Sequence, residues 1–188
     1  MQPADVVALR NTEKGSLFMV GSGPSLLKDF GLLSQLDKRN TWAINRLPGW
    51  DALPFRPTFW SASERGHFSR HVKGFEHLPE TVAAGTRCFA IHHVVPRITK
   101  MGLAQHVVKS IDVQVEHIGM AGLGETLPEL PNAHSGILTT MQLAFWMGFT
   151  SIYLLGTEFT DNGYAWAPGP SRGYRSKQGN RAVKVFGM

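Results

Sequence analysis

The residues with the clearest chemical potential form the short turn at positions 21–25, GSGPS, which follows the apolar run at 17–20, LFMV. A buried strand that passes through small residues into a helix leaves backbone N–H groups at the helix start, where the helix dipole favours a negative charge. The glycines allow a ligand to approach the backbone, the proline fits a first helical turn, and either serine can cap the helix. We therefore expect a phosphate, and hence a nucleotide, at this turn. The binding residues assigned to it are Gly21, Ser22, Gly23 and Ser25.

An ordinary strand-to-helix turn with a capping serine has the same local sequence, so this alternative stays open. The segment reads G-x-G-x-x-L, which lacks the third glycine of the dinucleotide-binding fingerprint. The chain also contains no G-x-x-x-x-G-K-[ST] sequence, which excludes a Walker-type phosphate loop.

Short apolar runs alternate along the chain with segments typical of helices. The predicted strands lie at 16–21, 41–45, 58–63, 87–92, 112–118 and 151–155, and the predicted helices at 26–36 and 135–147. This alternation predicts a single Rossmann-like α/β domain, with a mostly parallel sheet and helices on both faces. Ligands of such folds bind at the carboxyl ends of the strands. Asn45, Ser63, Glu64, Gly156 and Glu158 stand at or just after predicted strand ends, so we expect them to share one crevice with the glycine turn.

The charge is unevenly distributed along the 188 residues. We expect residues 1–15 to be a poorly ordered lead-in, 16–161 the nucleotide-binding domain, and 162–188 a basic flexible tail or lid. The net charge is +5, and the last segment has no acid after position 161 but five basic residues: Arg172, Arg175, Lys177, Arg181 and Lys184. They form no compact cluster with stacking aromatic side chains, so we do not expect a nucleic-acid partner.

Composition also limits the setting of the protein. The apolar runs are well short of the ~20 residues that a membrane span needs, and no signal-peptide pattern opens the sequence. Cys88 is the only cysteine, which excludes an internal disulfide, and its apolar surroundings predict a core position. We expect a cytoplasmic protein that binds a small-molecule nucleotide or nucleotide sugar; whether it forms an oligomer is left open.

Five short segments, in this order, carry a resemblance to a known superfamily. They are GSGPSL after the first strand, AIN after the second, HSG at a helix start, GFTSIYLLGTEF, and GYAW. Together they resemble the nucleotide-binding core of bacterial family-42 sialyltransferases. The pattern is also similar to that of MptE-like proteins, named for the archaeal 6-hydroxymethylpterin diphosphokinase. The resemblance covers roughly residues 16–64 and 132–167.

The resemblance implies roles for residues outside the glycine turn. Asn45 matches an asparagine near the nucleotide and its sugar, and Ser135 and Gly136 match a turn whose backbone holds the nucleotide. Tyr164 matches the tyrosine of a Tyr-Ala-Phe segment. Glu158 stands where the family has an aspartate, and its carboxylate suits ribose hydroxyls or Mg²⁺.

The implied function is a glycosyltransferase that uses a CMP-linked or other nucleotide-activated sugar. The sialyltransferases have a histidine base downstream of the Tyr-Ala-Phe segment, whereas no histidine follows His134 here. The candidate catalytic residues are therefore His134 and Glu158. One alternative is an MptE-like pyrophosphokinase that uses ATP and Mg²⁺, in which Glu64, Glu158 and Asp161 gather around the metal. Another is a non-catalytic nucleotide-binding module.

Overall fold

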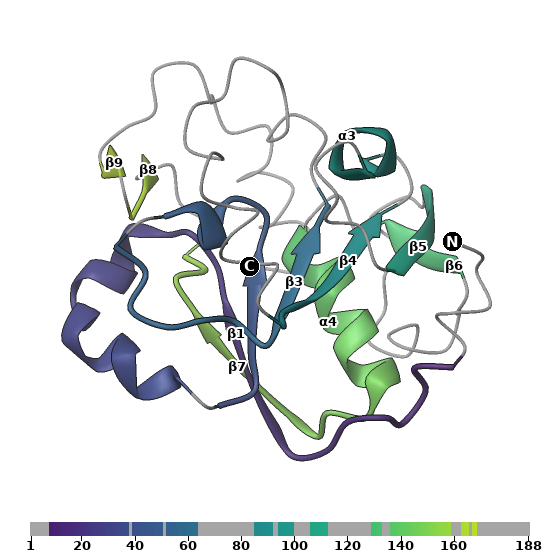
Figure 1. Ribbon diagram of the computed structural model, residues 1–188, viewed down its shortest axis with the longest axis horizontal. Helices are drawn as coiled ribbons and strands as arrows, with labels where there is room; N and C mark the ends of the chain where they lie inside the picture. Colours follow the sequence, from purple (N-terminus) through teal and green to yellow (C-terminus); the bar gives the residue numbers. More distant parts are fainter. Residues whose placement is uncertain are drawn as a thin grey trace, which may run out of the picture.

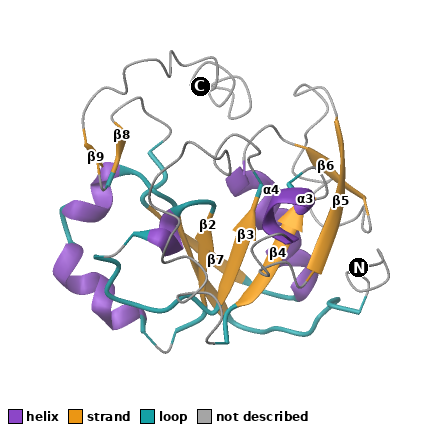
Figure 2. Cartoon of the chain, turned by 45° about the horizontal axis from the view of Figure 1, so that its top comes forward, coloured by secondary structure: helices purple, strands orange, loops and turns teal. Residues whose placement is uncertain are grey.

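A parallel β-sheet forms the centre of the protein. The computed structural model describes residues 8–37, 39–50, 52–63, 85–91, 94–99, 106–112, 129–132, 136–158, 163–165 and 167–168. In this part of the chain the sheet has seven strands in the order β6-β5-β4-β3-β2-β1-β7, and every neighbouring pair is parallel. The strands are β1 (Ser16–Val20), β2 (Thr41–Ile44), β3 (Phe59–Ala62), β4 (Arg87–Ile91), β5 (His106–Asp112), β6 (Glu129–Asn132) and β7 (Ser151–Leu155). The short strands β8 (Gly163–Tyr164) and β9 (Ala167–Pro168) pair antiparallel as a separate hairpin (Figure 2).

Short helices connect the strands. They are the 3₁₀ helices η1 (Pro24–Leu27), η2 (Phe30–Leu36) and η3 (Leu47–Gly49), and the α-helices α3 (Val95–Thr99) and α4 (Gly136–Met147). In Figure 1, α3 and the β8–β9 hairpin, which follow β4 and β7 in the chain, both lie at the upper side of the molecule. The carboxyl ends of the parallel strands therefore face that side.

One face of the sheet packs against α4 through a cluster of aromatic rings. Trp42, from β2, stacks on Phe59 and Phe89 with ring centroids 5.1 Å and 5.0 Å apart. The α4 side chains Leu143 and Met147 belong to the same buried cluster. Large aromatic side chains bury much apolar area, so this face supplies a major part of the hydrophobic stabilisation.

The opposite face is covered by the 3₁₀ helices and α3. Leu26 and Leu36, from η1 and η2, pack in one buried cluster with Leu47 of η3 and Ile98 of α3. Trp60 from β3 lies in this cluster and is fully buried. Both faces of the sheet are thus covered by helices, which confirms the predicted α/β class.

Several element predictions need correction. The single helix expected at 26–36 is two 3₁₀ helices that begin at Pro24 and are separated by Lys28 and Asp29. The strand expected at 112–118 does not begin at Asp112, because this residue is the last of β5. Residues 113–128 lie outside the described part of the chain, so the rest of that prediction stays open. Most of β5 was not predicted from the sequence, and neither α3 nor β6 was predicted at all. Their sequences, VPRIT and ELPN, each contain a proline, which obscures helix and strand patterns alike.

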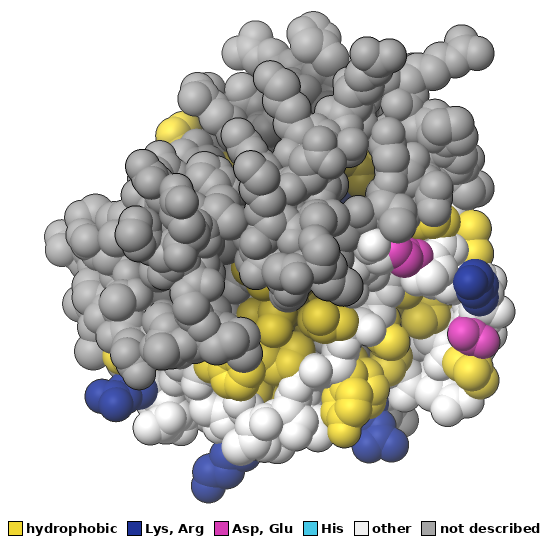
Figure 3. Space-filling view, turned by 180° about the vertical axis from the view of Figure 1, so that it is seen from behind, with side chains coloured by type: hydrophobic (Ala, Val, Ile, Leu, Met, Phe, Trp, Pro, Cys, Tyr) yellow, Lys and Arg dark blue, Asp and Glu magenta, His cyan; other side chains and the backbone are white. Residues whose placement is uncertain are grey.

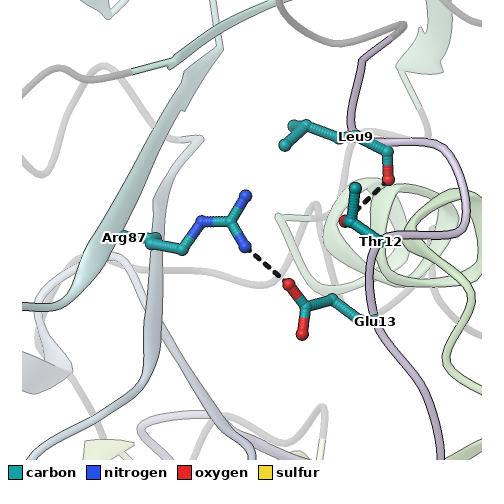
Figure 4. Close-up of polar contacts among 4 residues, drawn as sticks. All are labelled: Leu9, Thr12, Glu13 and Arg87. Atoms are coloured by element: carbon teal, nitrogen blue, oxygen red, sulfur yellow. Dashed lines mark hydrogen bonds and ion pairs between the residues drawn. The ribbon is translucent and has the colours of Figure 1, made fainter.

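Residues 8–15 pack onto the end of α4 instead of forming a loose lead-in. The backbone N–H groups of Asn11 and Glu13 donate to the carbonyl oxygens of Trp146 and Met147 at 3.1 Å and 2.8 Å. The Glu13 carboxylate forms an ion pair with Arg87 of β4, with Oε1 2.5 Å from a guanidinium nitrogen (Figure 4). The first described segment therefore ties α4 to the sheet.

Some large hydrophobic side chains remain exposed: Leu27, Leu32, Phe145, Tyr153 and Leu154. Figure 3 shows hydrophobic side chains reaching the surface on the face turned away in Figure 1. Two of the exposed residues belong to β7, which is an edge strand of the sheet. Within the described ranges, no helix is long and apolar enough to cross a membrane. Most of the basic segment predicted at 162–188 lies outside the described residues.

Candidate functional site

The strand order reverses direction at β1. From β1 the chain proceeds to β2, β3 and β4 on one side, and β7 is added on the other side of β1. In open parallel sheets, the carboxyl ends of the two strands that flank such a reversal form a crevice where ligands bind. The glycine turn at 21–25 follows β1, and residues 156–158 follow β7. The fold therefore brings two predicted binding segments together at this position.

Both glycines of the turn lie against the chain that leaves β7. Gly21 and Gly23 donate their backbone N–H groups to the carbonyl oxygens of Leu155 and Gly156, each at 2.8 Å. A Cβ atom on Gly21 would lie 2.4 Å from the Gly156 oxygen, and a Cβ on Gly23 would overlap the Glu158 carboxylate. Glycine is required at these two positions because the two strand ends approach so closely.

The backbone N–H groups of the turn are bonded within the chain, so the expectation that they are free is wrong for several of them. Besides the two glycines, the Ser25 N–H donates to Oε1 of Glu158, which is 133 residues away in the sequence. Leu26 N–H donates to the Gly23 carbonyl oxygen at 3.2 Å. A carboxylate is a natural cap for helical N–H groups. Only the tertiary fold brings this carboxylate to the turn, so no local sequence pattern indicates the contact.

Glu158 has one carboxylate oxygen without a protein partner. Its Oε2 atom is buried, faces Gly23, and has no hydrogen-bond partner in the described part of the protein. A buried acceptor that is left unsatisfied costs about 1–3 kcal/mol, more when it is charged. A hydroxyl, ammonium or metal ion of a ligand would satisfy this oxygen. Glu158 is therefore the predicted site residue with the clearest capacity to contact a ligand.

Asn45 connects the carboxyl ends of β2 and β3. Its backbone has φ +52°, a left-handed conformation that asparagine tolerates better than most residues. Its Oδ1 accepts hydrogen bonds from the Ser63 backbone N–H at 2.9 Å and from Ser63 Oγ at 3.2 Å. The Asn45 carbonyl oxygen accepts from Trp60 Nε1 at 2.7 Å. These bonds fix the side-chain amide in one orientation.

The start of α4 lies against the same group of residues. A Cβ atom on Gly136 would be 2.1 Å from Ser63 Oγ and 3.2 Å from Asn45 Nδ2, so α4 can approach only because this residue is glycine. Thr140 Oγ1 bonds to the Gly136 carbonyl oxygen at 2.6 Å and lies 2.8 Å from Ser61 Oγ. Asn45 and Gly136 thus lie together. Ser63, expected in the same crevice from its place at a predicted strand end, joins them.

Arg46 was not assigned to the site from the sequence. It follows Asn45 at the carboxyl end of β2, is half-buried, and interacts electrostatically with Tyr164. Burial lowers the pKa of Arg46, and Tyr164 raises it by a smaller amount. Tyr164 is held near the glycine turn because the next residue, Ala165, donates its N–H to the Ser22 carbonyl oxygen at 2.8 Å. The sequence feature that could have identified Arg46 is its position, because it is a basic residue directly after the asparagine at the end of a predicted strand.

Four predicted site residues lie outside the described part of the chain: His134, Ser135, Glu64 and Asp161. The base assigned to His134 and the metal ligands assigned to Glu64 and Asp161 therefore stay predictions. Among the residues that the structure does describe, no group of three histidine, cysteine, aspartate or glutamate side chains could hold a metal ion.

Comparison of the chain with protein-family models and with curated proteins finds no match. The function is therefore inferred from the geometry of the strand ends and from the sequence patterns described above.

Proposed function

We propose that this protein is a nucleotide-binding transferase built on a Rossmann-like domain, and that its crevice lies at the carboxyl ends of β1, β2, β3 and β7. The observation that carries the proposal is the meeting of the β1 and β7 ends at the reversal of strand order, with the buried Glu158 Oε2 between them. Asn45 and Ser63 lie at the neighbouring strand ends, and Gly136 lies against them at the start of α4. Such a crevice is where open α/β sheets hold nucleotides.

Each side chain has a role that matches its chemistry. Glu158 Oε2 accepts a hydrogen bond from a ribose hydroxyl of the nucleotide, because a neutral O–H donor satisfies it without introducing a second negative charge. The Asn45 side chain, oriented by Ser63, packs its amide against Gly136 and so holds the start of α4 beside this position. The Glu158 contact recognises the nucleoside rather than its phosphate.

The favoured donor substrate is a nucleotide-activated sugar, of the CMP-linked type that the sequence resemblance implies. In glycosyl transfer the bond between the anomeric carbon and the phosphate oxygen breaks, and the nucleotide departs with that electron pair. The acceptor hydroxyl forms the new bond and loses its proton to a general base. His134, which stands just before the start of α4, is the proposed base.

A thermal-shift titration with CMP, CDP, UMP and ATP, each with and without Mg²⁺, tests nucleotide binding. We expect CMP to raise the melting temperature without metal, since a ligand stabilises the folded state that binds it. Stabilisation by ATP only in the presence of Mg²⁺ would instead favour the pyrophosphokinase alternative. If no nucleotide raises the melting temperature, the proposal is wrong.

Two further measurements locate the site and test catalysis. Gly23→Ala places a methyl group where the Glu158 carboxylate lies, so nucleotide stabilisation should be lost; Gly31→Ala, at an open position in η2, is the matched control and should bind normally. Hydrolysis of a CMP-sugar, followed by mass spectrometry, separates an enzyme from a binding module. A protein that binds CMP but turns over no donor would be the non-catalytic module.

A further inference from the structure

The phosphate of a nucleotide needs a positive partner, and the glycine turn offers fewer donors than its sequence suggests. The N–H groups of Gly21, Gly23 and Ser25 already donate within the chain, the last of them to the negatively charged Glu158. A phosphate placed against the same amides would compete with these bonds and meet a like charge. The phosphate-binding group of this crevice must therefore be sought among the side chains.

Arg46 is a cation at the correct edge of the sheet. It begins directly after Asn45, whose left-handed backbone turns the chain at the carboxyl end of β2, and η3 follows it. Strand β2 pairs with β1, so Arg46 and the glycine turn end adjacent strands. Tyr164 interacts electrostatically with Arg46, and the hydrogen bond from Ala165 N–H to the Ser22 carbonyl oxygen holds the backbone next to this tyrosine at the turn.

The surroundings of Arg46 strengthen its capacity to attract an anion. The side chain is half-buried, and attraction between charges increases where water is partly excluded. A guanidinium stays protonated even where burial lowers its pKa, and its planar fork can donate to two phosphate oxygens at once. Tyr164, which interacts electrostatically with Arg46, carries an O–H group that is a neutral donor.

We propose that Arg46, assisted by the hydroxyl group of Tyr164, binds the phosphate of the nucleotide, while Glu158 binds its ribose. This inference rests on the proposed nucleotide-binding function. It divides the crevice into two sides: the end of β2 binds the anionic phosphate, and the end of β7 binds the ribose hydroxyl groups. It assigns phosphate recognition to a side chain instead of to the backbone of the glycine turn.

Paired ligands test this assignment. The dissociation constants of CMP and of cytidine are measured by calorimetry for the wild-type protein, Arg46→Gln, Arg46→Lys, Tyr164→Phe and the control Arg39→Gln. Arg39 is exposed and precedes β2, at the opposite end of the same strand. We expect Arg46→Gln to reduce the preference for CMP over cytidine by about 10- to 100-fold, as for the loss of a charged hydrogen bond. Cytidine affinity itself should change little.

The other variants separate the effects of the positive charge, the tyrosine hydroxyl group and the position in the fold. Arg46→Lys should keep part of the preference because it keeps the charge, Tyr164→Phe should lose a smaller part, and Arg39→Gln should lose none. If Arg46→Gln retains the wild-type preference, the assignment is wrong although the nucleotide site stands. If the wild-type protein binds neither ligand, the proposed function fails and the assignment fails with it. Melting temperatures measured without ligand establish whether each variant is folded. If Arg46→Gln does not fold, Arg46→Lys replaces it in the test. An Arg46→Lys preference for CMP over cytidine equal to that of Arg39→Gln would then overturn the assignment.

Discussion

Glu158 combines a structural and a chemical role in one side chain. One oxygen caps Ser25 N–H and so holds the end of β7 against the glycine turn, and the other is buried without a partner in the described residues. Natural proteins seldom leave a buried acceptor unsatisfied without a functional reason. The ribose contact that we propose would account for the second oxygen, and the hydrogen bond to the first holds the turn in place without a ligand.

Glu158→Gln should weaken ribonucleoside binding by about tenfold, because a neutral amide replaces a charged acceptor. The paired ligands are cytidine and 2′,3′-dideoxycytidine, compared by calorimetry. We expect the wild-type preference for cytidine to disappear in the variant. Asp29→Asn, an exposed acid between η1 and η2, is the control and should keep the preference. An unchanged preference in Glu158→Gln would show that this carboxylate serves structure alone.

The buried thiol of Cys88 makes the folding stability of the protein depend on pH. It lies in β4, almost wholly buried, with Sγ 3.5 Å from the Thr86 carbonyl oxygen, and burial raises the pKa of its thiol to about 12. An unfolded cysteine titrates near about 8.5. Between these two values the folded state holds a proton that the unfolded state has lost. Stability from this group is therefore complete below about pH 8.5 and declines as the pH rises toward 12.

Cys88→Ala removes this proton linkage. Urea denaturation between pH 9 and pH 11 should show a free energy of unfolding that falls more steeply in the wild-type protein, by about 1.4 kcal/mol per pH unit. The comparison of slopes cancels the titration of lysine and tyrosine side chains, which both proteins share. Equal slopes would mean that the thiol is accessible to solvent in the folded state.

At the scale of elements, α4 contributes both packing and an unexplained polar group. Leu143 and Met147 pack on the aromatic cluster of the sheet, whereas Gln142 is 1 % exposed and neither atom of its amide has a hydrogen-bond partner in the described part of the chain. Such a group reduces stability, since its hydration is lost and nothing replaces it. The helix tolerates this cost because its apolar contacts are extensive.

Gln142→Met should raise the free energy of unfolding by about 1–3 kcal/mol, because methionine has a similar shape and no polar atoms to satisfy. Equilibrium denaturation in urea measures the change. Gln35→Met, at an exposed position in η2, is the control and should alter stability by less than about 0.5 kcal/mol. Destabilisation by Gln142→Met would indicate that a water molecule or a ligand satisfies the amide in solution.

At the scale of the whole molecule, one chain of polar contacts links several of the described elements. The first described segment bonds to the end of α4, and through Glu13 it reaches Arg87 of β4. The Arg87 guanidinium lies over the rings of Phe59 and Phe89, at 5.6 Å and 6.0 Å from their centroids. This ion pair therefore connects the first segment, the helix layer and the sheet across the aromatic cluster.

A double-mutant cycle with Glu13→Gln and Arg87→Gln measures the connection. We expect a coupling free energy of about 0.5–1 kcal/mol, since both side chains keep some exposure to solvent and screening limits the pair. The coupling should decrease when the salt concentration is raised from 0.05 M to about 1 M. A coupling near zero, unchanged by salt, would mean that the two side chains do not interact in solution.

The order of apolar runs and breaks was enough to determine the α/β class, most of the strand positions and the helix before β7, because hydrophobic periodicity and glycine or proline breaks are local properties. The 3₁₀ character of the segments after β1, and strands with irregular patterns such as β6, depend on packing that no local window contains. The same distinction between local sequence and tertiary packing applies to the residues of the site. The glycine turn and Asn45 were predicted from strand ends and Gly136 from the family resemblance, whereas only the tertiary structure brought Glu158 onto the Ser25 N–H and Arg46 under the electrostatic influence of Tyr164. The physical reason is that a hydrogen bond or a desolvated charge depends on neighbours in space, and the fold alone decides which distant residues those are.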